Sequence, residues 1–315
     1  YRLGTGPHIV LEGDEYDTAY FDKGPKFLHY PARVAVLTSV EFDHADIYRD
    51  LAHVQSAFAR FVSHLAPEAV LLAASGKETL GPVLADGRCR ILRYGWGVDD
   101  DWAVGKVTVS PPWTEVEVLR GGRAYAVLRT KMMGEHNLAK IMAAAAAADA
   151  AGVRPADVAR ALATFSGVRR RQEVRGVKHG VTVMDDFAHH PTAVRETIRA
   201  VRPFFPAGRL MAVFEPRTNS SMRRVFQDIY PACFDEADLV CIRKPPLLAK
   251  IPEPERFSSE QLVADLRRRS KDAHFFAETG PIVDFVAGKA APGDLVLVMS
   301  NGGFDNIHAR LLAAL

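Results

Sequence analysis

Ionisable side chains gather at residues 185–191 of this sequence, which read DDFAHHP. The apolar run GVTVM comes directly before them, and the helix-forming stretch TAVRETIRAVRPFF follows. The aspartates (Asp185, Asp186) and the histidines (His189, His190) should therefore lie at the carboxyl end of a strand, where open α/β sheets usually bind ligands. Such side chains can bind a metal, act as a general base or hold a substrate, and the motif alone leaves these roles open.

Two further loops carry side chains that could bind a divalent metal. The acidic run EGDEYD, residues 12–17, follows the apolar residues 9–11, which predict a buried strand. A second run, EFDHAD at residues 41–46, follows a strand predicted at residues 34–40. Magnesium takes few protein ligands and keeps waters and phosphate oxygens, so a carboxylate with an imidazole indicates a Mg²⁺ site. The alternative is a pair of solvated acidic loops, with His44 capping a helix.

The motif GEHN, residues 134–137, stands before an alanine-rich stretch that predicts a helix ending at Gly152. Asn137 offers a donor and an acceptor to the edge of a heterocycle, and a helix N-terminus favours anionic groups. Capping of the helix is the alternative role for His136 and Asn137.

Arginines cluster in RRRQEVRG, residues 169–176, where we expect a linker between two domains. An arginine at such a place could stabilise the charge that develops on a transferred phosphoryl group. The alternative is a solvated linker without a chemical role.

Two polar loops, FEPRTNSS at residues 214–221 and MSNGGF at residues 299–304, follow predicted strands on the same sheet edge as DDFAHHP. Arg217 is suited to bidentate recognition of a carboxylate. Gly302 and Gly303 permit a close approach of the backbone. Three polar loops on one edge indicate a ligand site, because turns rarely need so many charged groups together.

The predicted elements that must position these residues belong to two domains, as 315 residues lead us to expect. Residues 88–130 read as β-rich, with RGGR as a hairpin turn. Beyond residue 170 the pattern alternates regularly, which predicts βαβ units and a mostly parallel sheet. The strands are expected at 181–186, 209–214, 238–242, 273–276 and 294–299, and the helices at 192–203, 221–230, 258–269 and 280–288.

Composition excludes several classes of protein. A formal net charge of +2 gives no reason to expect nucleic acid or an anionic membrane as partner. The longest low-charge runs are shorter than the ~20 apolar residues of a membrane span. The three cysteines are widely spaced, which disfavours a disulfide scaffold or a zinc site and suits a reducing cytosol. Because the first residue is not methionine, we expect sequence upstream of it.

Taken in order, seven stretches resemble one family, the Mur ligases, which are ATP-dependent amino-acid and peptide ligases of peptidoglycan synthesis. These are VLEGDEYDTAYFDKGPKFLHY, EFDHADIY, MGEHN, RRRQEVRG, DDFAHHPTAV, FEPRTNS and MSNGGF, and they span essentially the whole chain. They are most similar to the branch that joins UDP-N-acetylmuramate to recycled L-alanyl-γ-D-glutamyl-meso-diaminopimelate. The resemblance implies a cytoplasmic α/β protein, with a partial central ATP-binding domain over residues 1–168 and a Rossmann-like doubly wound domain over residues 169–315.

The resemblance also implies ATP and Mg²⁺ as cofactors and assigns a role to each site residue. Glu12 and His44 would hold Mg²⁺, and Arg171 would face the γ-phosphate. The nucleotide would contact His136, Asn137 and Asp186, with Asn137 at the adenine. The pocket for the peptide and the reacting groups would be lined by His189, His190, Arg217, Ser300, Asn301, Gly302 and Gly303. DDFAHHP would then be a clamp that completes the site when two domains close.

Three departures from the family pattern carry consequences. The glycine-rich G-x-x-G-K-[ST] loop that cradles phosphate is absent, so we expect this chain to be the C-terminal two-thirds of a longer ligase, with weak or no catalysis alone. Lys140 stands where the family usually has a second asparagine, three residues after Asn137. No lysine lies between His44 and Lys77, so a carbamylated lysine is not expected there.

Three alternatives to the tripeptide ligase stay open. The first is a ligase that joins UDP-N-acetylmuramate to L-alanine. The second is a metal-dependent hydrolase that uses His44 with the cluster at residues 185–190, although these belong to different predicted domains. The third is a non-catalytic protein that binds a nucleotide sugar or a peptide.

Overall fold

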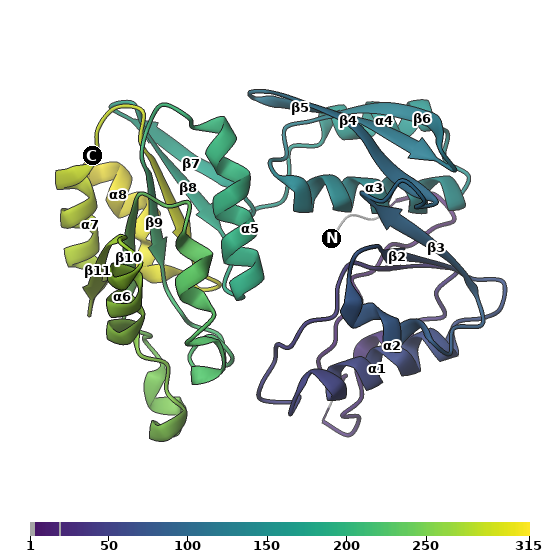
Figure 1. The fold of residues 1–315 in the computed structure, drawn as a ribbon, viewed down its shortest axis with the longest axis horizontal. Coiled ribbons are helices and arrows are strands. Elements are labelled where there is room, and N and C mark those ends of the chain that lie inside the picture. The colour runs from purple at the N-terminus through teal and green to yellow at the C-terminus, as the bar shows by residue number, and fades with distance from the viewer. Residues whose placement is uncertain (1–3, 19) are drawn as a thin grey trace.

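The first lobe of the computed structural model, which describes residues 4–18 and 20–315, is built around a six-stranded sheet (Figure 1). Its strands follow one another in chain order, with β1 to β4 parallel and β4 to β6 antiparallel. The strands are β1 (Val34–Leu37), β2 (Val70–Ala74), β3 (Arg90–Gly95), β4 (Trp102–Ser110), β5 (Trp113–Arg120) and β6 (Arg123–Thr130). The predicted RGGR hairpin is confirmed: Gly121 and Gly122 join β5 to β6 with φ of 54° and 73°, as a two-residue hairpin turn requires.

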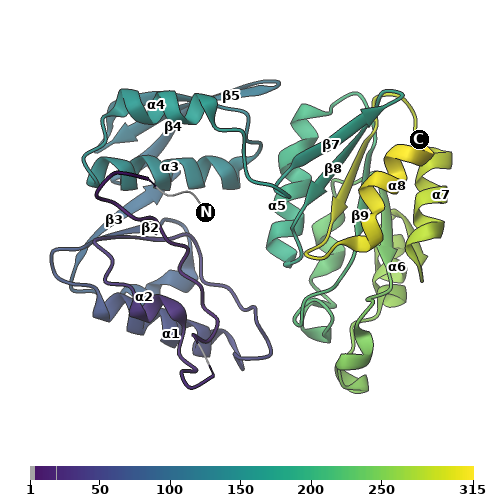
Figure 2. The ribbon, with the colours of Figure 1, turned by 180° about the vertical axis from the view of Figure 1, so that it is seen from behind.

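Helices cover this sheet with the apolar faces that their spacing predicts. They are α1 (Leu51–His64), α2 (Gly81–Leu84), α3 (Glu135–Ala150) and α4 (Pro155–Thr164). α1 starts at Asp50, whose carboxylate accepts from the backbone N–H of His53. α3 contacts β1, β2 and β3, and α4 lies beside α3 and β6 (Figure 2). The predicted end of α3 is confirmed, because the chain leaves the helix at Gly152 with φ of 81°.

The second lobe is a doubly wound sheet with strand order β11-β10-β9-β12-β8-β7. Only β7 is antiparallel to its neighbour. The strands are β7 (Glu173–Lys178), β8 (Val181–Asp186), β9 (Leu210–Phe214), β10 (Leu239–Arg243), β11 (Asp272–Phe276) and β12 (Leu295–Met299). One core packs α5 (Pro191–Val201) and α6 (Ser259–Arg268) against the sheet, and a second core packs α7 (Thr279–Lys289) and α8 (Ile307–Ala314). Both views place α5 on the side that faces the first lobe.

The expectation of an α/β chain whose second half is doubly wound is therefore confirmed, since helices lie on both faces of a mostly parallel sheet. The strand ends of β8, β9 and β12 lie side by side at one edge, where backbone bonds join them: Ser300 donates to Asp186 O and Glu215 to Met299 O, each over 3.1 Å. The domain boundary between residues 168 and 169 stays a prediction.

Two predicted elements are wrong. Residues 9–11 form no strand; Ile9 and Val10 are 80% and 94% exposed, because these apolar residues pair with no strand among those described. Residues 221–230 form no α-helix but short 3-10 turns, of which the second contains Pro231. Proline lacks the backbone N–H and disfavours helical backbone at the residue before it.

Two elements of the second lobe were not predicted. Residues 173–178, expected to belong to the linker, form the edge strand β7, so the connection between the sheets is shorter than predicted. The C-terminal helix α8 was missed as well. No helix of the described part of the chain has the length and apolar character needed to cross a membrane.

Candidate active site

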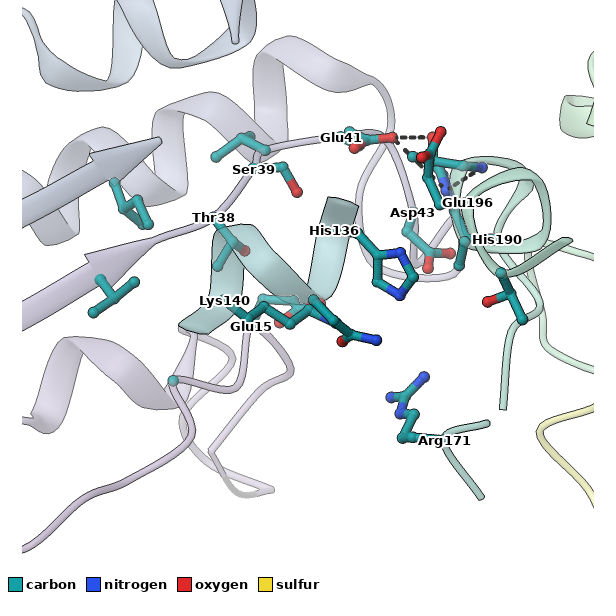
Figure 3. A pocket seen from close by; sticks show the side chains of 18 of the residues that line it. Glu15, Thr38, Ser39, Glu41, Asp43, His136, Lys140, Arg171, His190 and Glu196 are labelled. Atoms are coloured by element: carbon teal, nitrogen blue, oxygen red, sulfur yellow. Dashed lines mark hydrogen bonds and ion pairs between the residues drawn. The ribbon is translucent and has the colours of Figure 1, made fainter. Parts of the chain in front are cut away.

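A cavity of about 630 Å³ lies between the two lobes, and elements from both line it (Figure 3). The loop after β1 contributes Thr38 and Ser39, and the first turns of α3 contribute His136 and Lys140. Arg171 reaches toward the cavity from the linker. The second lobe adds Asp186, His190, Thr192, Ala193, Glu196 and Thr197. Motifs far apart in the sequence therefore meet at one interface.

His44 lies at this cavity with a carboxylate beside it, but that carboxylate belongs to Glu15. The Nε2 atom of His44 is 2.5 Å from Oε1 of Glu15. The predicted Glu12–His44 pair is not formed, because Glu12 is exposed and does not line the cavity, whereas Glu15 and Asp43 do. The alternative role of His44 as a helix cap is also excluded, since Asp50 caps α1.

The charge around His44 suits a divalent cation. Burial by itself lowers the pKa of His44, but the hydrogen bond with Glu15 and the charges of Asp43 and Asp46 raise it overall. Magnesium needs only one or two protein carboxylates and completes its shell with waters and phosphates. Glu15 and His44 fit such a sparse site. The described residues hold no group of three or more His, Cys, Asp or Glu side chains arranged for a metal.

At the start of α3, Asn137 is turned inward and holds the linker. Its side chain is 4% exposed, and its amide nitrogen donates to Met133 O over 2.8 Å and to Oε1 of Gln172 over 3.1 Å. The donor that was expected to read adenine is therefore engaged within the protein. Lys140, which replaces the expected second asparagine, lines the cavity one turn further along the helix.

His136 lines the cavity from the first turn of α3 and carries an unpaired, buried ring nitrogen. Its Nδ1 is buried and has no hydrogen-bond partner among the described residues. Burial, reinforced by the positive charge of Lys140, lowers the pKa of His136 to about 4. At neutral pH the imidazole is therefore uncharged, and a nucleotide in the cavity could satisfy its free nitrogen.

The depressed pKa of His136 should make the protein more sensitive to acid. The pKa lies near 4 in the folded protein and near 6.5 when unfolded, so the unfolded state binds more protons between these values. The free energy of unfolding should therefore fall as the pH drops from about 6.5 toward 4. Urea unfolding at both pH values should show that the free energy of unfolding falls less for His136→Gln than for the wild type. An equal decrease in the free energy of unfolding of both proteins would contradict the lowered pKa of His136.

The linker is held by both aspartates of DDFAHHP. Asp186 is 3% exposed and accepts from the backbone of Gln172 over 2.9 Å and of Ala188 over 2.7 Å. Burial raises the pKa of Asp186, against these hydrogen bonds and the charge of Arg171. Asp185 faces Arg170, with 3.5 Å between Oδ2 and Nε. Asp186 also lines the cavity, as its expected contact with nucleotide requires.

The histidines of the same motif face the first lobe. His190 Nε2 is 3.2 Å from Phe42 O, and its Nδ1 accepts from the backbone of Thr192 at the start of α5. His189 Nε2 lies 3.9 Å from Asp43, and burial lowers the pKa of His189. His190 lines the cavity, whereas His189 does not. The motif thus bridges the linker and the first lobe, as a clamp would.

The remaining predicted residues form a separate cluster at the ends of β9 and β12, outside the cavity lining. Its centre is Glu215, which is fully buried, accepts from Oγ of Ser300 over 2.8 Å and pairs with Arg243. Arg217 lies 3.6 Å from the same carboxylate. A Cβ atom on Gly302 would lie 2.2 Å from Cδ of Arg217, so only glycine permits this approach. Asn301 lies in the same loop, and its Oδ1 is buried without a hydrogen-bond partner among the described residues.

Sequence reasoning missed four residues that organise these sites: Glu15, Arg170, Gln172 and Glu215. Each lies within one of the motifs identified in the sequence, but a different residue of that motif was predicted to have the functional role. The signal for Glu215 was its place directly after a fully apolar strand, where a charge must find partners within the fold. No comparable signal marks Gln172, whose partners are Met133 before α3, Asn137 in α3 and Asp186 at the end of β8.

Comparison with known proteins agrees with this arrangement. Residues 8–148 match the family model described as Mur ligase middle domain, and residues 170–302 match the model described as Mur ligase, glutamate ligase domain. The chain is 38% identical over 315 residues to UDP-N-acetylmuramate–L-alanyl-gamma-D-glutamyl-meso-2,6-diaminoheptandioate ligase of Escherichia coli (strain K12). That match covers 100% of this chain and 66% of the relative, so the chain spans about two-thirds of the length of that protein.

Two further relatives define the comparison. UDP-N-acetylmuramate–L-alanine ligase of Rhizobium meliloti (strain 1021) is 31% identical over 319 residues, which covers 98% of this chain and 65% of that protein. The crystal structure of a murein peptide ligase from Psychrobacter arcticus 273-4 superposes with a TM-score of 0.66 and 29% identity. It covers 96% of this chain and 61% of that structure.

Proposed function

Because this chain belongs to the Mur ligase family, we propose that its protein is an ATP-dependent ligase that joins UDP-N-acetylmuramate to L-alanyl-γ-D-glutamyl-meso-diaminopimelate. The observation that carries the proposal is the interlobe cavity, which brings His44, His136 and Arg171 together from three motifs of the family pattern. The higher identity to the tripeptide ligase of E. coli than to the L-alanine ligase of R. meliloti favours the tripeptide.

In the proposed reaction, the carboxylate of UDP-N-acetylmuramate attacks the γ-phosphorus of ATP, and the bond to ADP breaks. The amine of the tripeptide then attacks the acyl phosphate, phosphate leaves, and the amine loses a proton. Arg171 would stabilise the charge of the transferred phosphoryl group, and neutral His136 would contact the nucleotide. His44 and Glu15 would hold Mg²⁺, which neutralises phosphate charge when bound.

The cluster around Arg217 is the proposed site for the peptide. A guanidinium group suits bidentate binding of a carboxylate, and the tripeptide carries several. Ser300, Asn301 and Gly302 would form the wall of this site with His189 on the same sheet edge. The substrates imply a cytoplasmic reaction, and three free, buried cysteines agree with a reducing compartment.

The direct test is phosphate release by the protein expressed from its complete reading frame, with ATP, Mg²⁺ and UDP-N-acetylmuramate. We expect turnover with the tripeptide and at most background release with L-alanine. Turnover with L-alanine alone would assign the protein to the second ligase activity. No release with either amine, while nucleotide sugar or peptide still binds, would support the non-catalytic alternative.

A further inference from the structure

Arg170, the linker residue directly before Arg171, holds the loop that follows β12. Its Nη2 atom donates to Ser300 O over 2.5 Å and to Gly302 O over 2.7 Å. Its Nη1 atom donates to Asn301 O over 3.3 Å. The carbonyl groups of three consecutive residues thus converge on one guanidinium group that is about 130 positions away in the sequence. Hydrogen bonds to a charged donor are stronger than neutral ones, so this contact can fix the loop.

Arg170 is itself held by contacts of its backbone and its side chain. Its backbone N–H donates to Oε2 of Glu173 over 2.8 Å, and its carbonyl accepts from Phe187 over 2.8 Å. Its guanidinium group lies over the ring of Phe187, 5.0 Å from the centroid, and beside buried Asp185. The residue has φ of 59°, a conformation that costs a non-glycine residue free energy and persists only where the surrounding contacts hold it.

The loop that Arg170 holds is in turn packed against Arg217. Gly302 lies so close that a Cβ atom would clash with the Arg217 side chain. The hydroxyl of Ser300 donates to Glu215 and accepts from the backbone of Gly302 over 3.0 Å, so loop and Arg217 share the same buried carboxylate. A shift of residues 300–302 would therefore change the packing around the Arg217 side chain.

We propose that Arg170 is a positioning residue for the amine-bearing substrate: it holds Ser300–Gly302, and through Gly302 the Arg217 guanidinium, in the arrangement that binds a substrate carboxylate. This rests on the proposed function. It deepens that function because Arg170 and Arg171 are consecutive, so one short segment contacts both the nucleotide cavity and the loop of the peptide site. Asp185 would assist by pairing with Arg170.

The first test is steady-state kinetics of the complete protein with Arg170→Ala, Arg170→Lys and Arg169→Ala. Arg169 is the matched control, since it is exposed and forms no hydrogen bond or ion pair with the residues that the structure describes. We expect Arg170→Ala to raise the KM for tripeptide about tenfold, as the loss of charged hydrogen bonds implies. The KM for ATP should stay within about twofold. Lysine keeps the charge and should restore part of the affinity.

The second test does not depend on enzymatic activity. It measures amide hydrogen exchange in the loop after β12, over residues 299–304. Exchange there should be faster in Arg170→Ala than in Arg169→Ala, with the remaining second lobe unchanged. Equal effects on both KM values, or unchanged exchange in the loop, would overturn the role of Arg170. If the wild-type protein releases no phosphate with any amine, the proposed function is wrong, and the positioning role of Arg170 is wrong with it.

Discussion

Replacing His44 by alanine should lower the turnover of the complete protein by more than about 100-fold, because even outer partners of a metal ligand contribute roughly 10- to 100-fold. The Nε2 atom of His44 lies 2.5 Å from Glu15 at the interlobe cavity, and Asp43 and Asp46 add negative charge that favours a cation there. The Mg²⁺ concentration for half-maximal turnover should rise as well. Turnover measured across a magnesium titration, at saturating ATP, tests both statements.

The control is His64→Ala, which removes an exposed histidine from the last turn of α1. A His44→Ala protein with the magnesium dependence of this control would contradict the ligand role. Turnover of Glu15→Gln and of Glu12→Gln, measured in the same titration, then shows which carboxylate binds Mg²⁺ together with His44. The structure favours the larger loss for Glu15→Gln, and a larger loss for Glu12→Gln would restore the pair inferred from the sequence.

Most of the second lobe was predictable because its central strands are buried on both faces and read as short apolar runs between helical patterns. Leu210–Phe214 and Leu295–Met299 are buried throughout, as central parallel strands are. The same rule failed for residues 9–11, because an apolar run becomes a strand only where a neighbouring strand can pair with it. β7 was missed since its exposed edge position permits the polar sequence EVRGVK.

The candidate site was predictable at the level of loops but not of individual side chains. Strand order brings the ends of β8, β9 and β12 together, so their polar loops had to meet. Within a loop, the backbone geometry determines which side chain reaches the site, and here Glu15 rather than Glu12 contacts His44. Some side chains join segments that are distant in the sequence, as Gln172 of the linker does by bonding to Met133 and Asn137. Such contacts leave no local pattern in the sequence.

Replacing Glu215 by alanine should lower the free energy of unfolding by about 3–5 kcal/mol, the usual cost of removing one member of a buried ion pair. Glu215 is fully buried, and its carboxylate accepts from Arg243 and from the hydroxyl of Ser300. Without it, Arg243, which is 8% exposed, has Asp305, at 2.6 Å, as its one remaining acidic partner among the described residues. Urea unfolding of the variant and the wild type measures the difference.

The expected loss comes mainly from the charge left behind, so a double variant should recover much of it. Buried ion pairs replaced by apolar side chains of similar volume are often neutral or stabilising. Glu215→Leu with Arg243→Met should therefore be more stable than Glu215→Leu alone, although the double variant also frees Ser300 and Arg217 from their common partner. A double variant that is no more stable than Glu215→Leu would show that the carboxylate acts mainly through Ser300 and the loop after β12.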